Sequence, residues 1–160
     1  MQIYVDFNKQ NGYNLPALYF LLQRSTPKHI DILIGVTMAD KNSILVVDDE
    51  EALRTVLSSE LEGEGYAVAS AGDGDEAMTA LQEKAFDLVL LDIKMPKVDG
   101  FEVLRFIKER YPTTKVIMLT GFADLKNAIE SKKLGAEDFV SKPYDLVDLL
   151  TTIERVLTSE

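Results

Sequence analysis

Acidic side chains follow directly on two strongly apolar runs of the sequence. The run at 44–47 leads into four consecutive carboxylates, Asp48 to Glu51, and a second run at 86–91 ends at Asp92. Carboxylates held close together raise one another's pKa values unless a cation neutralises them. The same four acids would equally suit the first turn of a helix, where negative charge is favourable. The spacing leaves two interpretations, an ordinary helix start or half of a cation site.

From residue 43 onward, short apolar runs alternate with amphipathic segments. The runs have the length of buried strands, and the segments have helical spacing with glycines at several of their ends. The predicted strands are 43–48, 67–71, 86–92, 115–121 and 137–143, and the predicted helices are 50–66, 72–84, 101–111, 124–135 and 145–157. The apolar stripe of the first helix comprises Ala52, Leu53, Val56, Leu57 and Leu61. This order predicts an α/β fold with a doubly wound, five-stranded parallel sheet.

Such a sheet would bring distant residues to one edge, because functional groups gather beyond the carboxyl ends of parallel strands. The groups at those ends are three carboxylates, a hydroxyl and an ammonium, from Asp48, Asp49, Asp92, Thr120 and Lys142. Three carboxylates suit a hard divalent cation such as Mg²⁺, which leaves coordination positions for phosphate oxygens. Lys142 would pair with an acid or a phosphoryl group, and Thr120 would donate a hydrogen bond to a phosphoryl oxygen.

The nucleophile available at this edge is a carboxylate. The chain has no cysteine, and its single histidine, His29, lies outside the repeating unit. Asp92 is the best candidate because it is the lone acid that ends a central strand, whereas Asp48 and Asp49 together have the character of metal ligands. Formation of an aspartyl phosphate requires mainly positioning and charge neutralisation, which these groups supply.

Four motifs resemble, in combination, the receiver domain of two-component response regulators over residues 41–157: VVDDEE, LLDIKMPKVDG, MLTG and DFVSKP. The resemblance implies a flavodoxin-like sheet with the strand order 2-1-3-4-5. It also implies that Asp92 accepts a phosphoryl group from the phosphohistidine of a sensor histidine kinase or a phosphotransfer protein. Asp49, Asp92 and the backbone carbonyl of Lys94 would ligate Mg²⁺, with Asp48 holding the waters of the ion.

The same resemblance assigns a conformational switch. Thr120 and Lys142 would bind the phosphoryl oxygens, and Phe139 stands where the family places a Tyr/Phe side chain that turns inward as Thr120 moves. The peptide between Lys142 and Pro143 is expected to be cis. Phosphorylation would thereby shift an equilibrium that exists before phosphorylation.

Output is expected through partner binding. The face formed by 124–135, 137–143 and 145–157 is where the resemblance places a downstream effector protein or a homodimer contact. The protein is not expected to be an enzyme beyond Mg²⁺-dependent self-phosphorylation and autodephosphorylation. Two alternatives are a receiver fragment of a longer transcriptional regulator of the AAA+ class, whose receivers the passage 120–150 resembles, and an engineered fusion that carries a receiver.

Composition argues against several other classes. A net charge of −10 offers no basic face for nucleic acid, and no apolar run approaches the roughly 20 residues of a membrane span. A cytoplasmic protein is therefore expected. A flavodoxin-like electron carrier would need a Ser-, Thr- and Gly-rich first loop, where this chain has DDEE. A phosphatase with an aspartate nucleophile would place that residue after the first strand, with a second acid two residues later, and would carry substrate-capping insertions. Here Asp48 is followed by Asp-Glu, and the sequence contains no such insertions.

The first 37 residues differ from the rest. They carry a net charge of +1, which leaves −11 for residues 38–160. The predicted domains are therefore an N-terminal extension at 1–37 and a receiver at 38–160. Two interpretations of the extension stay open: it adds a β-α-β unit, or it is a leader before a natural start at Met38.

Overall fold

The computed structural model of the protein describes residues 42–121 and 125–159. Within these ranges strands and helices alternate: β1 Ser43–Val47, α3 Glu51–Gly63, β2 Ala67–Ala71, α4 Gly74–Glu83, β3 Leu88–Asp92, α5 Gly100–Arg110, β4 Lys115–Thr120, α6 Leu125–Lys133, β5 Asp138–Ser141 and α7 Leu146–Thr158. Every strand and helix predicted after residue 42 is present. Most are shorter than predicted, but β2 has the predicted bounds, α5 begins one residue earlier and α7 ends one residue later. The predicted extension at 1–37 lies outside the described residues, so it and the boundary at 37/38 stay predictions.

The five strands form one parallel sheet in the order β2-β1-β3-β4-β5, which confirms the predicted fold class and strand order. The strand register aligns the carboxyl ends: Val47 of β1 pairs with Leu91 of β3, and Asp92 pairs with Leu119 of β4. Thr120 in turn pairs with Ser141, the last residue of β5. The residues that follow β1, β3, β4 and β5 are therefore neighbours at one edge.

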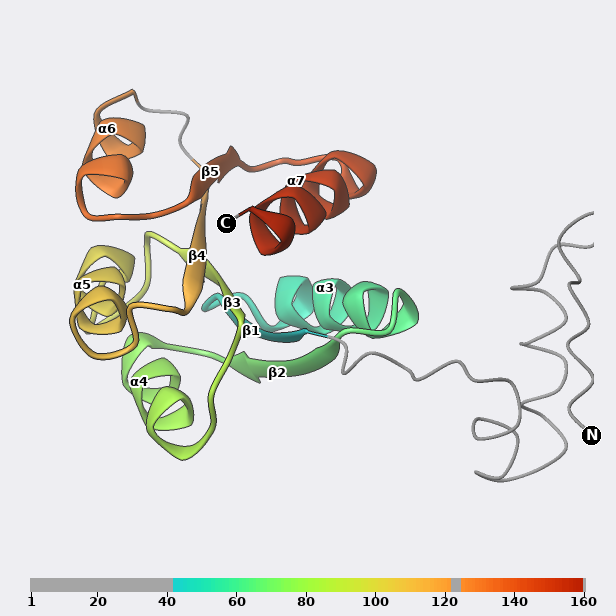
Figure 1. The fold of residues 1–160 in the computed structure, drawn as a ribbon, viewed down its shortest axis with the longest axis horizontal. Helices are drawn as coiled ribbons and strands as arrows, with labels where there is room; N and C mark the ends of the chain where they lie inside the picture. The colour runs from blue at the N-terminus through green and yellow to red at the C-terminus, as the bar shows by residue number, and fades with distance from the viewer. Residues whose placement is uncertain (1–41, 122–124, 160) are drawn as a thin grey trace, which may run out of the picture. The chain divides into compact units, whose positions relative to one another are not determined.

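Helices cover both faces of the sheet. Figure 1 shows α4, α5 and α6 on one side and α3 and α7 on the other. The central strand β3 supplies both cores in alternation, because successive side chains of a strand point to opposite faces. Val89 and Leu91 pack with α4 and α5, whereas Leu88 and Leu90 pack with α3 and α7. Strands buried on both faces explain the continuous apolar runs of the sequence.

The stripe by which α3 contacts the sheet is narrower than predicted. Leu57 and Leu61 are buried, but Val56 is 62% exposed and Ala52 is also exposed. The predicted stripe is too wide because Ala52 and Val56 form a separate i, i+4 row beside that of Leu57 and Leu61, and this row faces solvent. In the described part of the chain, no helix has both the length and the apolar character that a membrane span requires.

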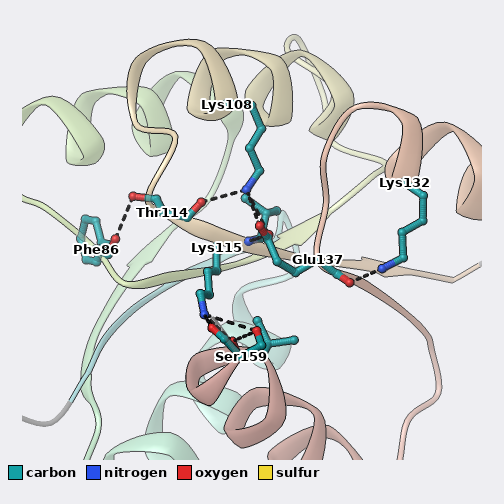
Figure 2. A network of polar contacts seen from close by, with 9 residues as sticks. Phe86, Lys108, Thr114, Lys115, Lys132, Glu137 and Ser159 are labelled. Atoms are coloured by element: carbon teal, nitrogen blue, oxygen red, sulfur yellow. Dashed lines mark hydrogen bonds and ion pairs between the residues drawn. The ribbon is translucent and has the colours of Figure 1, made fainter.

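A polar network fixes β4 and β5 at the end of the sheet opposite the predicted site (Figure 2). The Nζ atom of Lys108 on α5 lies 2.8 and 3.0 Å from the two carboxylate oxygens of Glu137, and it donates a third hydrogen bond to the carbonyl of Thr114 at 3.0 Å. The carboxylate of Glu137 also accepts from the backbone N–H of Val116 in β4. Both charged side chains are largely shielded from water, so this ion pair joins α5, β4 and the start of β5.

Replacing Lys108 by methionine is expected to lower the free energy of unfolding by about 2 kcal/mol, the scale of hydrogen bonds to a charged group. Methionine retains most of the apolar stem, so the loss reports the ammonium and its bonds to Glu137 and Thr114. Urea denaturation followed by circular dichroism measures the change. The matched control is Glu109→Gln, an exposed neighbour on α5. Equal stability of Lys108→Met and wild type would contradict a stabilising role for the network.

Candidate functional site: a carboxylate and lysine cluster

Three carboxylates and one ammonium meet at the carboxyl edge of the sheet, as predicted. Asp48 follows β1, Asp92 ends β3, and Lys142 follows β5. One carboxylate oxygen from each of Asp48, Asp49 and Asp92 lies within 4.8 Å of the other two. Asp48 and Asp92 are buried, whereas Asp49 is exposed. The parallel topology thus assembles groups that stand up to 94 positions apart in the chain.

Lys142 bridges the two buried acids. Its Nζ atom donates a hydrogen bond to Oδ2 of Asp48 and another, of 3.0 Å, to Oδ2 of Asp92. Burial opposes the positive charge of Lys142, but the hydrogen bonds and the charges of the two carboxylates outweigh burial and raise the pKa of Lys142 above its ordinary value. The lysine therefore stays protonated at neutral pH and partly neutralises the acidic cluster.

Asp92 is held in an environment that disfavours its charge. Burial raises the pKa of Asp92 above its ordinary value, and the nearby carboxylate of Asp48 acts in the same direction. Lys142 and the backbone N–H of Lys94, 3.4 Å from Oδ1 of Asp92, act in the opposite direction without cancelling the rise. A buried carboxylate with a displaced pKa at the rim of a sheet is a recognised mark of a functional group.

Asp48 is fixed by both its main chain and its side chain. Its N–H donates to the carbonyl of Ala71 at 3.2 Å, and its Oδ1 accepts from the N–H of Glu50 at 2.9 Å. Its carbonyl accepts from Nη1 of Arg54 at 2.6 Å. The cap residue of α3, Glu50, makes no capping hydrogen bond through its side chain, and Glu51 lies in the first turn of the helix. The helix-start interpretation therefore suits Glu51, whereas Asp48 belongs to the cluster.

The remaining predicted residues lie close to this edge. Thr120 ends β4 with no exposed surface, and its carbonyl accepts a hydrogen bond from the N–H of Lys142 at 2.6 Å. Phe139 is half-buried and packs against the core formed with α4 and α5. Lys94 is exposed, two residues beyond Asp92. The peptide between Lys142 and Pro143 is cis, as expected.

Two residues that support the site were not identified from the sequence. Arg54 binds the carbonyl of Asp48, and Gly100 lies so close to Asp92 that a Cβ atom would stand 2.1 Å from the carbonyl oxygen of Asp92. Arg54 is a polar residue of a helix, for which the sequence pattern predicts an exposed side chain. Gly100 ends a motif that is typical of an ordinary Pro/Gly turn.

A cavity of about 460 Å³ lies between the amino ends of β1, β3 and β4, and none of the predicted site residues lines it.

Comparisons with known proteins agree with this fold. The response regulator receiver domain family matches residues 44–154. The chain is 41% identical over 117 residues to the transcriptional regulatory protein ZraR of Salmonella typhimurium, covering 73% of this chain and 26% of that protein. It is 37% identical over 118 residues to the DNA-binding transcriptional regulator NtrC of Proteus hauseri, covering 74% and 25%.

Solved structures give the same result. A CheY-like receiver domain protein from Methanospirillum hungatei aligns with a TM-score of 0.71 and 37% identity, covering 73% of this chain and 94% of that one. The receiver domain of NtrX from Brucella abortus aligns with a TM-score of 0.70 and 35% identity, covering 73% and 99%. The chain therefore belongs to the family of response-regulator receiver domains. It spans about a quarter of the length of the two curated relatives.

Proposed function

We propose that Asp92 is the phosphoacceptor of this receiver and takes its phosphoryl group from a sensor histidine kinase or a phosphotransfer protein. The observation that carries the proposal is the setting of Asp92. It ends a central strand, is 6% exposed, and is bonded to Lys142 within a cluster of three carboxylates. Such a group is accessible to a phosphodonor only at the carboxyl edge of the sheet, where ligands of parallel α/β folds bind.

In the transfer, a carboxylate oxygen of Asp92 forms a bond to the phosphorus of the phosphohistidine. The phosphorus–nitrogen bond breaks, and the released imidazole takes up a proton from water. Lys142, which bridges Asp48 and Asp92 beforehand, transfers a hydrogen bond to a phosphoryl oxygen, so its ammonium stays paired. The hydroxyl of Thr120 donates to another phosphoryl oxygen, and Phe139 turns inward with the movement of Thr120.

Mg²⁺ fits the residues present, because the site offers hard oxygen donors at close spacing. Asp49, Asp92 and the carbonyl of Lys94 would ligate the ion, with Asp48 hydrogen-bonded to its waters. When bound, the ion supplies positive charge to the phosphoryl oxygens. Asp49 is exposed, so an ion from solvent can reach its carboxylate first. Asp48 is buried, and its hydrogen bonds already orient its side chain.

We infer that phosphorylation changes the face formed by α6, β5 and α7 and that an effector protein or a second copy of the chain binds there. The cytoplasm is the proposed compartment. A second proposal is that this receiver controls a longer transcriptional regulator. Its support is that the similar proteins ZraR and NtrC are named as transcriptional regulators and are about four times as long as the matched part.

The test is incubation with Mg²⁺ and acetyl phosphate, followed by intact mass spectrometry. Wild type is expected to gain one phosphoryl group, and Asp92→Asn none, because an amide oxygen is a poor nucleophile. Asp75→Asn, which removes an exposed acid in the first turn of α4, serves as the matched control and should label as wild type does. Equal labelling of Asp92→Asn and wild type would overturn the assignment.

A further inference from the structure

Arg54 makes a contact with the acidic loop that the proposed reaction does not use. It lies on α3, and its Nη1 donates a hydrogen bond of 2.6 Å to the main-chain carbonyl of Asp48. That carbonyl stands between the last residue of β1 and Asp49, at the turn from which both acidic side chains project. A guanidinium bonded to a carbonyl is a short, charge-assisted contact with fixed direction. It restrains the peptide that joins Asp48 to Asp49.

The guanidinium also lies against the turn that follows β2. A Cβ atom at Gly72 would lie 3.4 Å from Cζ of Arg54 and 3.3 Å from Oε2 of Glu76, so both side chains pack against the turn after β2. The N–H of Gly72 donates to that same Glu76 oxygen at 2.7 Å. Arg54 therefore connects the loop after β1 to the loop after β2, in a position that its neighbours define.

We propose that Arg54 is a positioning residue for the Mg²⁺ site: it holds the Asp48–Asp49 peptide so that the two carboxylates face Asp92. The inference rests on the proposed function, since it assigns a role toward the metal of that site. Outer residues that orient metal ligands affect metal affinity although they do not touch the ion. Asp49 depends most on this restraint, because it is exposed and its neighbour Asp48 has further hydrogen bonds of its own.

The positive charge of Arg54 would act in the opposite direction, because it repels a divalent cation at long range. The two effects separate with salt. In about 1 M sodium chloride the Debye length falls to about 3 Å, so the long-range repulsion is screened while the direct hydrogen bond persists. A positioning role predicts weaker Mg²⁺ binding without the arginine in high salt, and a purely electrostatic role predicts equal or tighter binding.

The experiment measures Mg²⁺ binding to the full chain by isothermal titration calorimetry in about 1 M sodium chloride. Arg54→Met is expected to weaken binding by about tenfold. Arg54→Lys, which keeps the charge but loses the planar donor group, should bind with an affinity between those of Arg54→Met and wild type. The matched control, Arg105→Met, removes an exposed arginine of α5 and should leave the affinity unchanged.

A second readout separates positioning from stability. The Mg²⁺ concentration that half-saturates labelling by acetyl phosphate should rise in Arg54→Met, while labelling at saturating Mg²⁺ reaches the wild-type level. Arg54 variants that are less stable but bind Mg²⁺ as wild type does would overturn the inference. If Arg54→Met does not fold, the Mg²⁺ affinity of Arg54→Lys is the test. An affinity equal to that of wild type would overturn the proposal. Absence of Mg²⁺ binding and labelling in wild type itself would instead refute the proposed function.

Discussion

Gly100→Ala is expected to lower the free energy of unfolding by roughly 3 kcal/mol or more, at or above the upper end of the usual range for overpacking. The added Cβ would stand 2.1 Å from the carbonyl oxygen of Asp92 and 2.9 Å from Cα of Ile93. Both are backbone atoms, so no side-chain rotation can relieve the contact. The start of α5 or the end of β3 must move, and either movement displaces Asp92. Thermal unfolding and acetyl phosphate labelling measure the two consequences, and both should be reduced.

The matched control for this substitution is Gly63→Ala. Gly63 is the last residue of α3, and a Cβ atom there would have no neighbour within 4 Å. Alanine favours a helix over glycine, so this variant should equal or slightly exceed wild type in stability. If Gly100→Ala has the melting temperature of wild type and is labelled at the same rate, the prediction is wrong. The loop from Ile93 to Gly100 would then adapt without moving Asp92.

The close approach of Gly100 also shows what the sequence could and could not predict. Apolar runs of strand length and glycine-ended amphipathic segments predict the sheet, and the rule for parallel strands then brings Asp92 and Lys142 to one edge. Both inferences depend on patterns that are local in the sequence. The distance between Gly100 and the carbonyl of Asp92 depends on how α5 returns to the end of β3, which no local pattern encodes.

The same limit applies to α3. An apolar stripe at helical spacing predicts which side of a helix is buried but not how wide the contact is, so Val56 was assigned to the core although it is mostly exposed. Arg54 shares that helix and is polar, so the pattern assigns it to solvent. In the structure its guanidinium instead reaches back to the carbonyl of Asp48, six residues earlier. The placement of the helix, rather than propensity, decides both residues.

Lys142→Met is expected to destabilise the metal-free protein by about 3 kcal/mol, the lower part of the range for removing one partner of a buried ion pair. The ammonium is the group that pairs with both Asp48 and Asp92, whose side chains are only 4% and 9% exposed. Without it, two buried carboxylates face each other. Mg²⁺ should stabilise this variant more than wild type, because the ion no longer competes with an ammonium for the same oxygens. Thermal unfolding with and without Mg²⁺ measures both effects.

Adding Asp48→Asn to Lys142→Met isolates the cause. The amide removes one of the two unpaired charges at nearly constant shape, so the double variant should regain part of the lost stability, a non-additivity expected of groups in contact. Lys97→Met removes an ion pair with Asp73 in which the lysine is 68% exposed, and it should change stability far less than Lys142→Met does, because water screens the pair. A double variant less stable than Lys142→Met would mean that lysine packing, rather than neutralisation of the carboxylates, stabilises this edge of the sheet. The double variant therefore distinguishes two roles of Lys142. In the first, its ammonium neutralises the carboxylates until a metal ion and a phosphoryl group replace it. In the second, its side chain only packs against this edge of the sheet.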